Sequence, residues 1–144
     1  MQEVIIFLAR FLILVPLAVV AFFILGARDI KLFVRVILSV VVINLLSEVT
    51  KFVIPMQRPY IGMDYNPGIW APLSGGSFFS SHTGTLFAVG AILWGRNKPL
   101  SFMSFAFGVV VGMLRVIIKV HYPIDIIAGA VFGIVVGFIA NHKI

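Results

Sequence analysis

Apolar residues fill five segments of this chain, and the short breaks between them carry most of its charged residues. This pattern predicts helices over residues 5–25, 31–54, 80 or 81–95, 100–120 and 123–140. About 20 apolar residues in a helix, at about 1.5 Å each, cross the roughly 30 Å hydrocarbon core of a bilayer. We therefore expect an all-α fold: a polytopic membrane helix bundle of about five transmembrane helices, with residues 1–144 forming one integral membrane domain.

The third predicted helix is shorter than the others, with 15 residues over positions 81–95. A helix of that length spans about 22 Å, which is less than the hydrocarbon core. Non-helical backbone is tolerated at membrane depth where protein or a water-filled cavity surrounds it. We therefore expect this helix to begin below the membrane surface, with His82 at the bottom of a pocket.

The longest break between helices, residues 55–79, is irregular and rich in proline and glycine. Connections of this length are usually either functional or disordered. Tyr60, Tyr65 and Trp70 lie within it, and such amphipathic rings favour the headgroup region of a membrane. The sequence therefore predicts an outer loop that forms a partial lid over a site.

Composition supports a membrane protein and removes several other classes. The chain is 61% hydrophobic and only 11% charged, and its mean hydropathy is +1.15, well beyond a soluble domain. Cysteine is absent, which excludes disulfides and thiolate metal sites. The formal charge is +6, but the basic residues are scattered among apolar segments without a polar face, so we expect no nucleic-acid partner. The charge instead indicates membrane topology and an anion site.

The basic residues fall unequally at the two ends of the predicted bundle. One end holds Arg28, Lys31, Arg35, Arg96, Lys98 and Lys143, and the other holds Arg10, Lys51, Arg58, Arg115 and Lys119. Three of the second group belong to a candidate site described below, and Arg10 is interpreted as reaching the membrane surface. The positive-inside rule then places the C-terminus in the cytoplasm and the site on the outer side. Residues 1–3 include no basic residue, so we expect the first helix to remain as an anchor.

Three separated groups of polar residues come at the same predicted level, at the outward ends of helices. They are Lys51 and Arg58; Ser80, Ser81 and His82; and Arg115, His121 and Asp125. A charged residue in an apolar helix costs about 2.5–3.5 kcal/mol on insertion scales, so such residues indicate function. Cations together with the free N–H groups of a helix start favour a polyanion, most simply a phosphate.

Each of these residues also has a simpler structural explanation. Asp125 follows Pro123 in the first turn of a helix, where an acidic residue favours the helix dipole. His82 alone is typical of a polar residue at a helix start. Glu48 lies one turn before Lys51, and we expect it to pair with that lysine or with Arg115. A stripe of Asn44, Glu48 and Lys51 is predicted to face protein.

Taken together, the three groups resemble the motifs of the type 2 phosphatidic acid phosphatases, a superfamily that includes glucose-6-phosphatase and vanadium haloperoxidases. The first motif, a lysine followed six residues later by Arg-Pro, matches Lys51 and Arg58-Pro59. The second, Pro-Ser-Gly-His, matches Phe79-Ser80-Ser81-His82. The third, Ser-Arg, then His and Asp, matches Leu114-Arg115, His121 and Asp125.

The order and spacing agree with the family, while three positions depart from it. Phe79 stands for proline, Ser81 for glycine and Leu114 for serine. These replacements affect the geometry of the phosphate loop more than the groups that transfer protons or phosphoryl. The family's membrane members commonly have six spans, and this chain is expected to lack the first.

The resemblance implies a role for each matched residue. His121 would be the nucleophile that accepts the phosphoryl group, Asp125 would orient it, and His82 would protonate the leaving oxygen. The residues that would hold the phosphoryl oxygens are Lys51, Arg58, Arg115, Ser80 and Ser81. Because cations take up the transferring charge, the resemblance implies no metal and no other cofactor.

The resulting hypothesis is a metal-independent membrane phosphatase that acts through a phosphohistidine on a lipid phosphate or diphosphate. Phosphatidic acid, phosphatidylglycerophosphate and polyprenyl diphosphate remain equal candidates, because the motifs contact the phosphate and not the lipid. A phosphoryl or headgroup transferase of the same superfamily is one alternative. A non-catalytic phosphate-binding or transport protein is another. The expected partners are the lipid phosphate substrate and membrane lipids, and the oligomeric state stays open.

Overall fold

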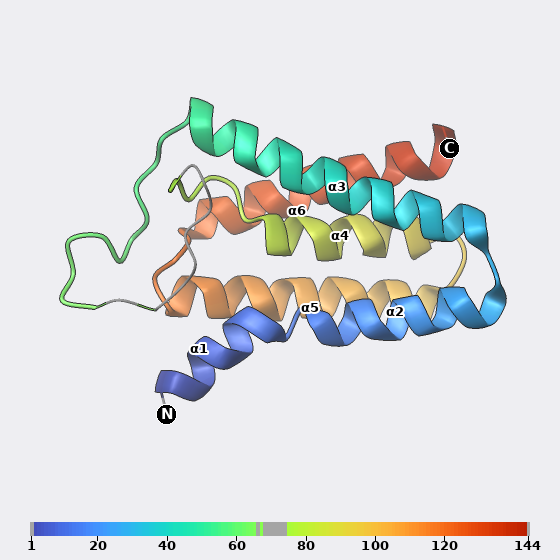
Figure 1. Cartoon of the computed structure of the whole chain (residues 1–144), viewed down its shortest axis with the longest axis horizontal. Coiled ribbons are helices and arrows are strands. Elements are labelled where there is room, and N and C mark those ends of the chain that lie inside the picture. The colour runs from blue at the N-terminus through green and yellow to red at the C-terminus, as the bar shows by residue number, and fades with distance from the viewer. Residues whose placement is uncertain (1, 66, 68–74, 144) are drawn as a thin grey trace.

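A computed structural model describes residues 2–65, 67 and 75–143, which form six helical segments in one elongated bundle (Figure 1). They are α1 (Gln2–Phe11), α2 (Leu14–Ala27), α3 (Ile30–Val53), α4 (Ser81–Leu93), α5 (Lys98–Ile117) and α6 (Pro123–Lys143). No strand occurs in the described ranges. The stretches 2–27, 30–53, 98–117 and 123–141 are each long and apolar enough to cross a membrane. The expected all-helical polytopic bundle is confirmed.

The first predicted helix is broken in the structure. α1 ends at Phe11 and α2 begins at Leu14, and the two segments diverge in direction (Figure 1). Pro16 explains the break because a proline has no N–H and its ring clashes with the carbonyl four residues earlier, here that of Leu12. That carbonyl instead accepts a 3.2 Å bond from the N–H of Val15. The prediction of one continuous helix over residues 5–25 was therefore wrong.

α4 lies at the centre of the bundle and is buried along nearly its whole length. It packs most extensively on α6 and also contacts α5 and α3. Glycines on α6 allow the close approach: a Cβ on Gly129 would lie 2.6 Å from the carbonyl oxygen of Ser80. Gly133 and Gly137 continue this contact along α4, so the glycines spaced four residues apart on α6 form a close-packing ridge. In Figure 1, α4 starts well inside the ends of α3 and α5.

The buried face of α3 differs from the predicted polar stripe. Ile43, Ser47 and Lys51 point into the protein, whereas Asn44 is exposed. Residues four apart lie on one helix face, whereas neighbouring residues are about 100° apart around the helix axis. Asn44 therefore lies off the buried face that includes Ile43. The Asn44 amide donates to the Val40 carbonyl at 2.8 Å, so it needs no partner from another helix. The prediction that Asn44 faces protein was wrong.

The remaining helix ends shift by a few residues from the predicted bounds. α5 begins at Lys98 because the Asn97 side chain accepts from the Leu100 N–H and caps the helix, with Pro99 in its first turn. The two ends of the chain lie at opposite ends of the bundle (Figure 1). The described parts of the connection between α3 and α4 lie at the same end as α1 (Figure 1). Trp70, expected to lie at the headgroup region, falls outside the described residues.

Candidate active site

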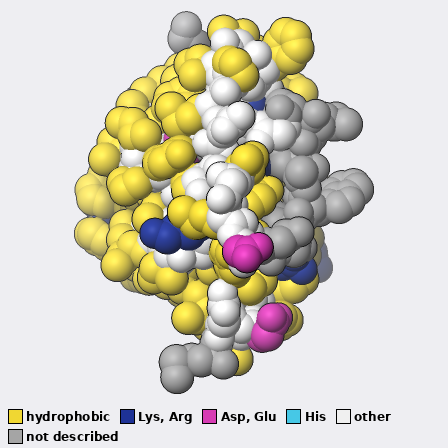
Figure 2. All heavy atoms as spheres, turned by 90° about the vertical axis from the view of Figure 1, so that its left-hand side faces the viewer, with side chains coloured by type: hydrophobic (Ala, Val, Ile, Leu, Met, Phe, Trp, Pro, Cys, Tyr) yellow, Lys and Arg dark blue, Asp and Glu magenta, His cyan; other side chains and the backbone are white. Residues whose placement is uncertain are grey.

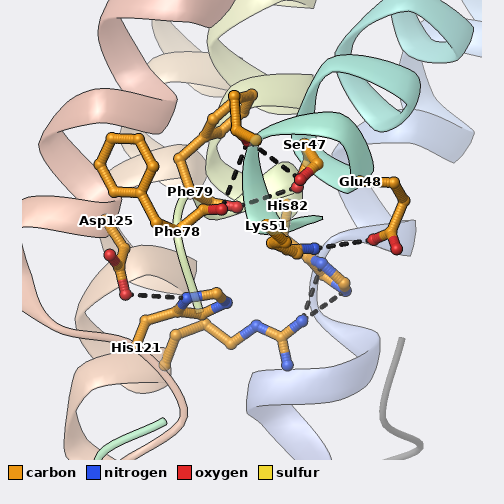
Figure 3. A network of polar contacts seen from close by, with 10 residues as sticks. Ser47, Glu48, Lys51, Phe78, Phe79, His82, His121 and Asp125 are labelled. Atoms are coloured by element: carbon orange, nitrogen blue, oxygen red, sulfur yellow. Dashed lines mark hydrogen bonds and ion pairs between the residues drawn. The ribbon is translucent and has the colours of Figure 1, made fainter. Parts of the chain in front are cut away.

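The three polar groups of the sequence meet at one end of the bundle, around the start of α4 (Figure 3). His82 lies within electrostatic range of the four other groups Arg115, His121, Lys51 and Arg58. Lys51, Arg58, Arg115 and His121 are each 4–5% exposed, and Asp125 is fully buried. Figure 2 looks onto this end and shows hydrophobic side chains over much of the face, with few charged ones.

His121 is positioned by the turn that joins α5 to α6. The carbonyl of Arg115 accepts bonds from the N–H groups of Val120 and His121, at 3.1 and 3.3 Å, with Lys119 in the left-handed conformation. The Nδ1 atom of His121 lies 3.3 Å from Oδ2 of Asp125. A carboxylate on Nδ1 fixes the tautomer and leaves Nε2 as the nitrogen with a free lone pair.

The electrostatics of His121 favour its neutral form. Burial lowers the pKa of His121 from its ordinary value to about 4, although the hydrogen bond to Asp125 acts in the opposite direction. A neutral imidazole is the nucleophilic form, because protonation removes the lone pair. His121 is therefore ready to attack an electrophile at neutral pH.

Asp125 also has the structural role considered from the sequence. The same Oδ2 atom accepts the backbone N–H of Tyr122 at 2.8 Å, which caps the start of α6. Its Oδ1 atom is buried and has no hydrogen-bond partner among the described residues. The carbonyl of Asp125 accepts the N–H of Ser80 at 3.1 Å, which joins the start of α6 to the start of α4. Capping and orientation of His121 are thus performed by one side chain.

His82 and Arg115 are in direct contact. Nη2 of Arg115 lies 2.8 Å from Nδ1 and 3.0 Å from Nε2 of His82. A guanidinium only donates hydrogen bonds, so the His82 nitrogen that accepts from it carries no proton. At most one ring nitrogen of His82 is then left to donate a proton. Nε of Arg115 is buried without a partner among the described residues.

Lys51 and Arg58 complete the cationic group. Lys51 Nζ lies 2.9 Å from Oε1 of Glu48, so the expected pairing of Glu48 with this lysine is confirmed. Burial lowers the pKa of Arg58, and Tyr60 and Asp125 oppose that effect. Its ordinary pKa is high enough that Arg58 stays charged.

The serines at the start of α4 have different surroundings. The N–H of Ser80 already donates to Asp125, and its hydroxyl accepts from Thr83 at 3.2 Å. Ser81 is the first helical residue and is half-buried. The first N–H groups of a helix have no partner within that helix. The backbone donors of this segment that are left without a partner in the helix therefore begin at Ser81.

Arg10 is a cation that the sequence interpretation left outside the candidate site. It is half-buried in α1, and its charge is close enough to Arg115 for the two to repel each other. The signal was present, because a charge within an apolar segment had singled out Arg115 by the same rule.

A hollow of about 640 Å³ opens beside these residues. Its lining consists of Met56, Gln57, Tyr122, Pro123 and Ile124. Gln57 directly precedes Arg58 and Tyr122 directly follows His121, so both walls adjoin site residues. No three histidine or acidic side chains gather as metal ligands in the ranges described.

Comparison with known families agrees with this geometry. The sequence model of the PAP2 superfamily matches residues 32–144. The chain belongs to the PAP2 superfamily. The match includes every residue of the three motifs. It begins after α1, α2 and the first two residues of α3.

Relatives of known name are lipid phosphatases and one transport protein. The lipid A 1-phosphatase of Rhizobium johnstonii is 38% identical over 102 residues, which is 66% of this chain and 41% of that protein. The undecaprenyl-diphosphatase BcrC of Bacillus subtilis is 32% identical over 63 residues, 44% of this chain and 33% of that protein. The bacitracin transport permease protein BcrC of Bacillus licheniformis is 34% identical over 58 residues, 40% of this chain and 29% of that protein.

This PAP2 chain thus spans less than half the length of each of these relatives. No solved structure matches it.

Two of the three departures from the PAP2 motifs are accommodated by packing. Phe79 is fully buried, its ring stacks on Phe132 with centroids 4.7 Å apart, and its carbonyl accepts from Ser47 at 2.9 Å. Leu114 packs against the cluster of Ala9, Ile118 and Val120. The segment before α4 is therefore held by an aromatic contact, and α1 packs against the position that the family gives to serine.

Proposed function

We propose that this protein is a metal-independent membrane phosphatase that removes a terminal phosphoryl group from a lipid phosphate or diphosphate. The single observation that carries the proposal is the arrangement of His121. Its Nδ1 faces the buried carboxylate of Asp125, and its free Nε2 lies in a cluster of buried cations with a second histidine. This arrangement supplies a nucleophile, charge stabilisation and an acid in one place.

In the first step, the lone pair of His121 Nε2 attacks the phosphorus as the bond to the leaving oxygen breaks. The leaving oxygen keeps the bonding electrons and takes a proton from the imidazolium form of His82, which becomes neutral. The negative charge on the equatorial oxygens is stabilised by Lys51, Arg58 and Arg115, since transition-state charge is the main target in phosphoryl transfer. The imidazolium of the new phosphohistidine is stabilised by Asp125.

In the second step, water attacks the phosphohistidine and the P–N bond electrons return to His121. His82, now without its proton, accepts one from the attacking water, and inorganic phosphate leaves. An imidazolium cannot accept a hydrogen bond, so the resting contact between His82 and Arg115 must break before the first step. Phosphate oxygens compete for Arg115, and their binding releases His82 to exchange protons.

The lipid part of the substrate fits the apolar surroundings of the site. The hollow beside Pro123 lies between the residues that follow α3 and the start of α6. Its walls are mostly apolar and adjoin Arg58 and His121, so a hydrocarbon chain there would bring its phosphate to the cations. The two phosphatase names among the relatives support a lipid substrate and leave lipid A-type, polyprenyl diphosphate and glycerophospholipid substrates open.

Two alternative functions remain, and the experiment below distinguishes them from a phosphatase. A phosphoryl transferase of the same superfamily would use an alcohol in place of water in the second step. Transport is favoured by the name of one relative, the bacitracin transport permease protein. A transporter would need the buried cations to bind phosphate but would not need the Asp125 contact on His121.

The decisive experiment measures phosphate release by purified protein from a panel of lipid monophosphates and diphosphates, with and without a chelator. The proposal predicts release that survives the chelator and is competitively inhibited by vanadate, which resembles the transferring phosphoryl group. Release that stops when magnesium is removed would refute the metal-free site. Release only when an alcohol is supplied would establish a transferase, and binding of phosphate without release would favour transport.

We further propose that the site faces the outer side of the membrane and that the C-terminus is cytoplasmic. The asymmetry of basic residues supports this orientation, because more of them lie at the end opposite the site. They include Arg28, Lys31, Arg35, Arg96 and Lys98. Labelling of single introduced cysteines with an impermeant reagent in intact cells is the test. Labelling near residue 97 from outside, with none near residue 62, would show the opposite orientation and contradict this proposal.

A further inference from the structure

The peptide group between Phe79 and Ser80, just before α4, is held by hydrogen bonds on both sides. Its carbonyl oxygen accepts the hydroxyl of Ser47 on α3 at 2.9 Å. Its N–H donates to the carbonyl of Asp125 on α6 at 3.1 Å. All four residues are fully buried. Figure 3 shows the side chain of Ser47 directed toward Phe79. The start of α4 is therefore fastened to α3 and to α6 through a single peptide group.

The two helices that hold this peptide group also carry chemical groups of the site. Ser47 lies about one turn before Lys51, on the same buried face of α3. Asp125 contacts Nδ1 of His121 at 3.3 Å. His82 follows the peptide group by two residues. A rotation of the peptide group would therefore move His82 relative to both Lys51 and His121.

Ser47 is the stronger of two hydroxyl contacts from α3 to this segment. A hydroxyl has one proton to donate, and Ser47 directs it to the carbonyl of Phe79. The hydroxyl of Thr50 is shared between the carbonyl of Ser47 at 3.0 Å and that of Phe78 at 3.3 Å. The stacking of Phe79 on Phe132 fixes the ring, whereas the direction of the carbonyl depends on its hydrogen bond.

We propose that Ser47 is a positioning residue for phosphoryl transfer, and that its hydroxyl sets the direction of the first N–H groups of α4 and of His82. This inference rests on the proposed function. Without the hydroxyl, the buried carbonyl of Phe79 loses its donor and the peptide group turns to find another. The loss then affects the transition state more than substrate binding, because transition-state charge needs donors in exact alignment.

The test is Ser47→Ala, which removes a single oxygen atom. We expect kcat for a lipid phosphate to fall about tenfold or more, with KM changed by less than about threefold. The dissociation constant of vanadate, measured by calorimetry on the purified protein, should rise by a similar factor, because vanadate resembles the transferring phosphoryl group. Ser47→Thr keeps the hydroxyl and should recover most of both quantities.

Ser39→Ala is the matched control. Ser39 lies about two turns before Ser47 on the same buried face of α3 and is 2% exposed. Its hydroxyl has no hydrogen-bond partner among the described residues. Both substitutions remove one buried hydroxyl from α3, so their difference isolates the bond to Phe79. The control should keep kcat and vanadate binding within about twofold. Equal losses in the two variants would show a general loosening of α3 and overturn the inference.

The remaining outcomes separate this inference from the proposed function. If wild-type protein releases phosphate and Ser47→Ala keeps its kcat and vanadate binding, or fails to fold, Ser47 has no positioning role. If wild-type protein binds vanadate but hydrolyses no lipid phosphate, the phosphatase proposal fails, and weaker vanadate binding in Ser47→Ala alone still supports the role of Ser47 at an anion site. If wild-type protein does neither, both proposals fail.

Discussion

The charged side chains at the two ends of the helix bundle differ in their exposure and in their pairing. At the end opposite the site, Arg96 pairs with Asp29, and the two side chains remain 35% and 30% exposed. The Leu32 N–H and Arg96 both hold the pKa of Asp29 below its usual range. At the site end, three cations are at most 5% exposed, and the Nε atoms of Arg58 and Arg115 have no partner among the described residues.

This difference shows which charges have a structural role and which need a ligand. Exposed pairs cost little to form and contribute little, because water solvates both partners. Buried cations in excess of anions are unfavourable unless a further anion compensates them. In the proposed function, the phosphate of the substrate would supply that anion, whereas the pair at the opposite end needs no ligand.

The largest expected effect follows from removing the nucleophile at the site end. His121→Ala should reduce phosphate release from any lipid substrate by at least about a thousandfold, since no other group can form the intermediate. Asp29→Asn at the opposite end is the control and should leave activity within about twofold. Substantial activity in folded His121→Ala protein would remove His121 from the mechanism.

The next effect depends on the leaving group. His82→Ala should slow the first step about 10²–10⁴-fold for a monophosphate lipid, whose alkoxide leaving group needs a proton. The loss should be much smaller for a diphosphate lipid, because a phosphate leaving group is far less basic, with a pKa of about 6. Single-turnover kinetics separate this step from the second. An equal loss on both substrates would make His82 a phosphate-binding residue.

A smaller effect distinguishes buried from exposed arginines. Arg115→Ala should lower kcat about 10²–10³-fold, as expected for loss of one donor that stabilises transition-state charge. Arg96→Ala should change kcat by less than about twofold, because its partner Asp29 lies at the other end. Steady-state assays on the two variants, with thermal unfolding to confirm folding, test the comparison. Similar losses in both variants would contradict it.

The smallest effect concerns pH. Because the pKa of His121 is lowered to about 4, the nucleophile should be lost only as pH falls through about 4, and not through its ordinary value of 6.5. Asp125→Asn should move this limb to lower pH, because the carboxylate raises the pKa. The measurement is kcat/KM against pH for a diphosphate lipid, corrected for substrate ionisation by phosphorus NMR. If the corrected kcat/KM instead fell as pH dropped through about 6.5, a buried neutral His121 would be contradicted.

Hydrophobic periodicity was enough to predict the helices and the meeting of the three motifs, because membrane length and motif spacing restrict both strongly. The break at Pro16 was harder to predict, because proline is tolerated in membrane helices. The direction of α1 is fixed only by its packing on Ile118 and Val120. Asn44 was misplaced because its polarity is satisfied by its own helix. The pairing of Arg115 with His82 joins residues 33 positions apart, which local sequence cannot specify.

The most direct test of the central claim is the stereochemistry at phosphorus. A lipid thiophosphate made chiral with oxygen isotopes would be hydrolysed in isotopically labelled water, and the configuration of the released thiophosphate determined. Each in-line displacement inverts phosphorus. Transfer first to His121 and then to water predicts two inversions and net retention. Net inversion would mean that water attacks the lipid directly, and it would contradict the phosphohistidine and the role given to the buried cationic end.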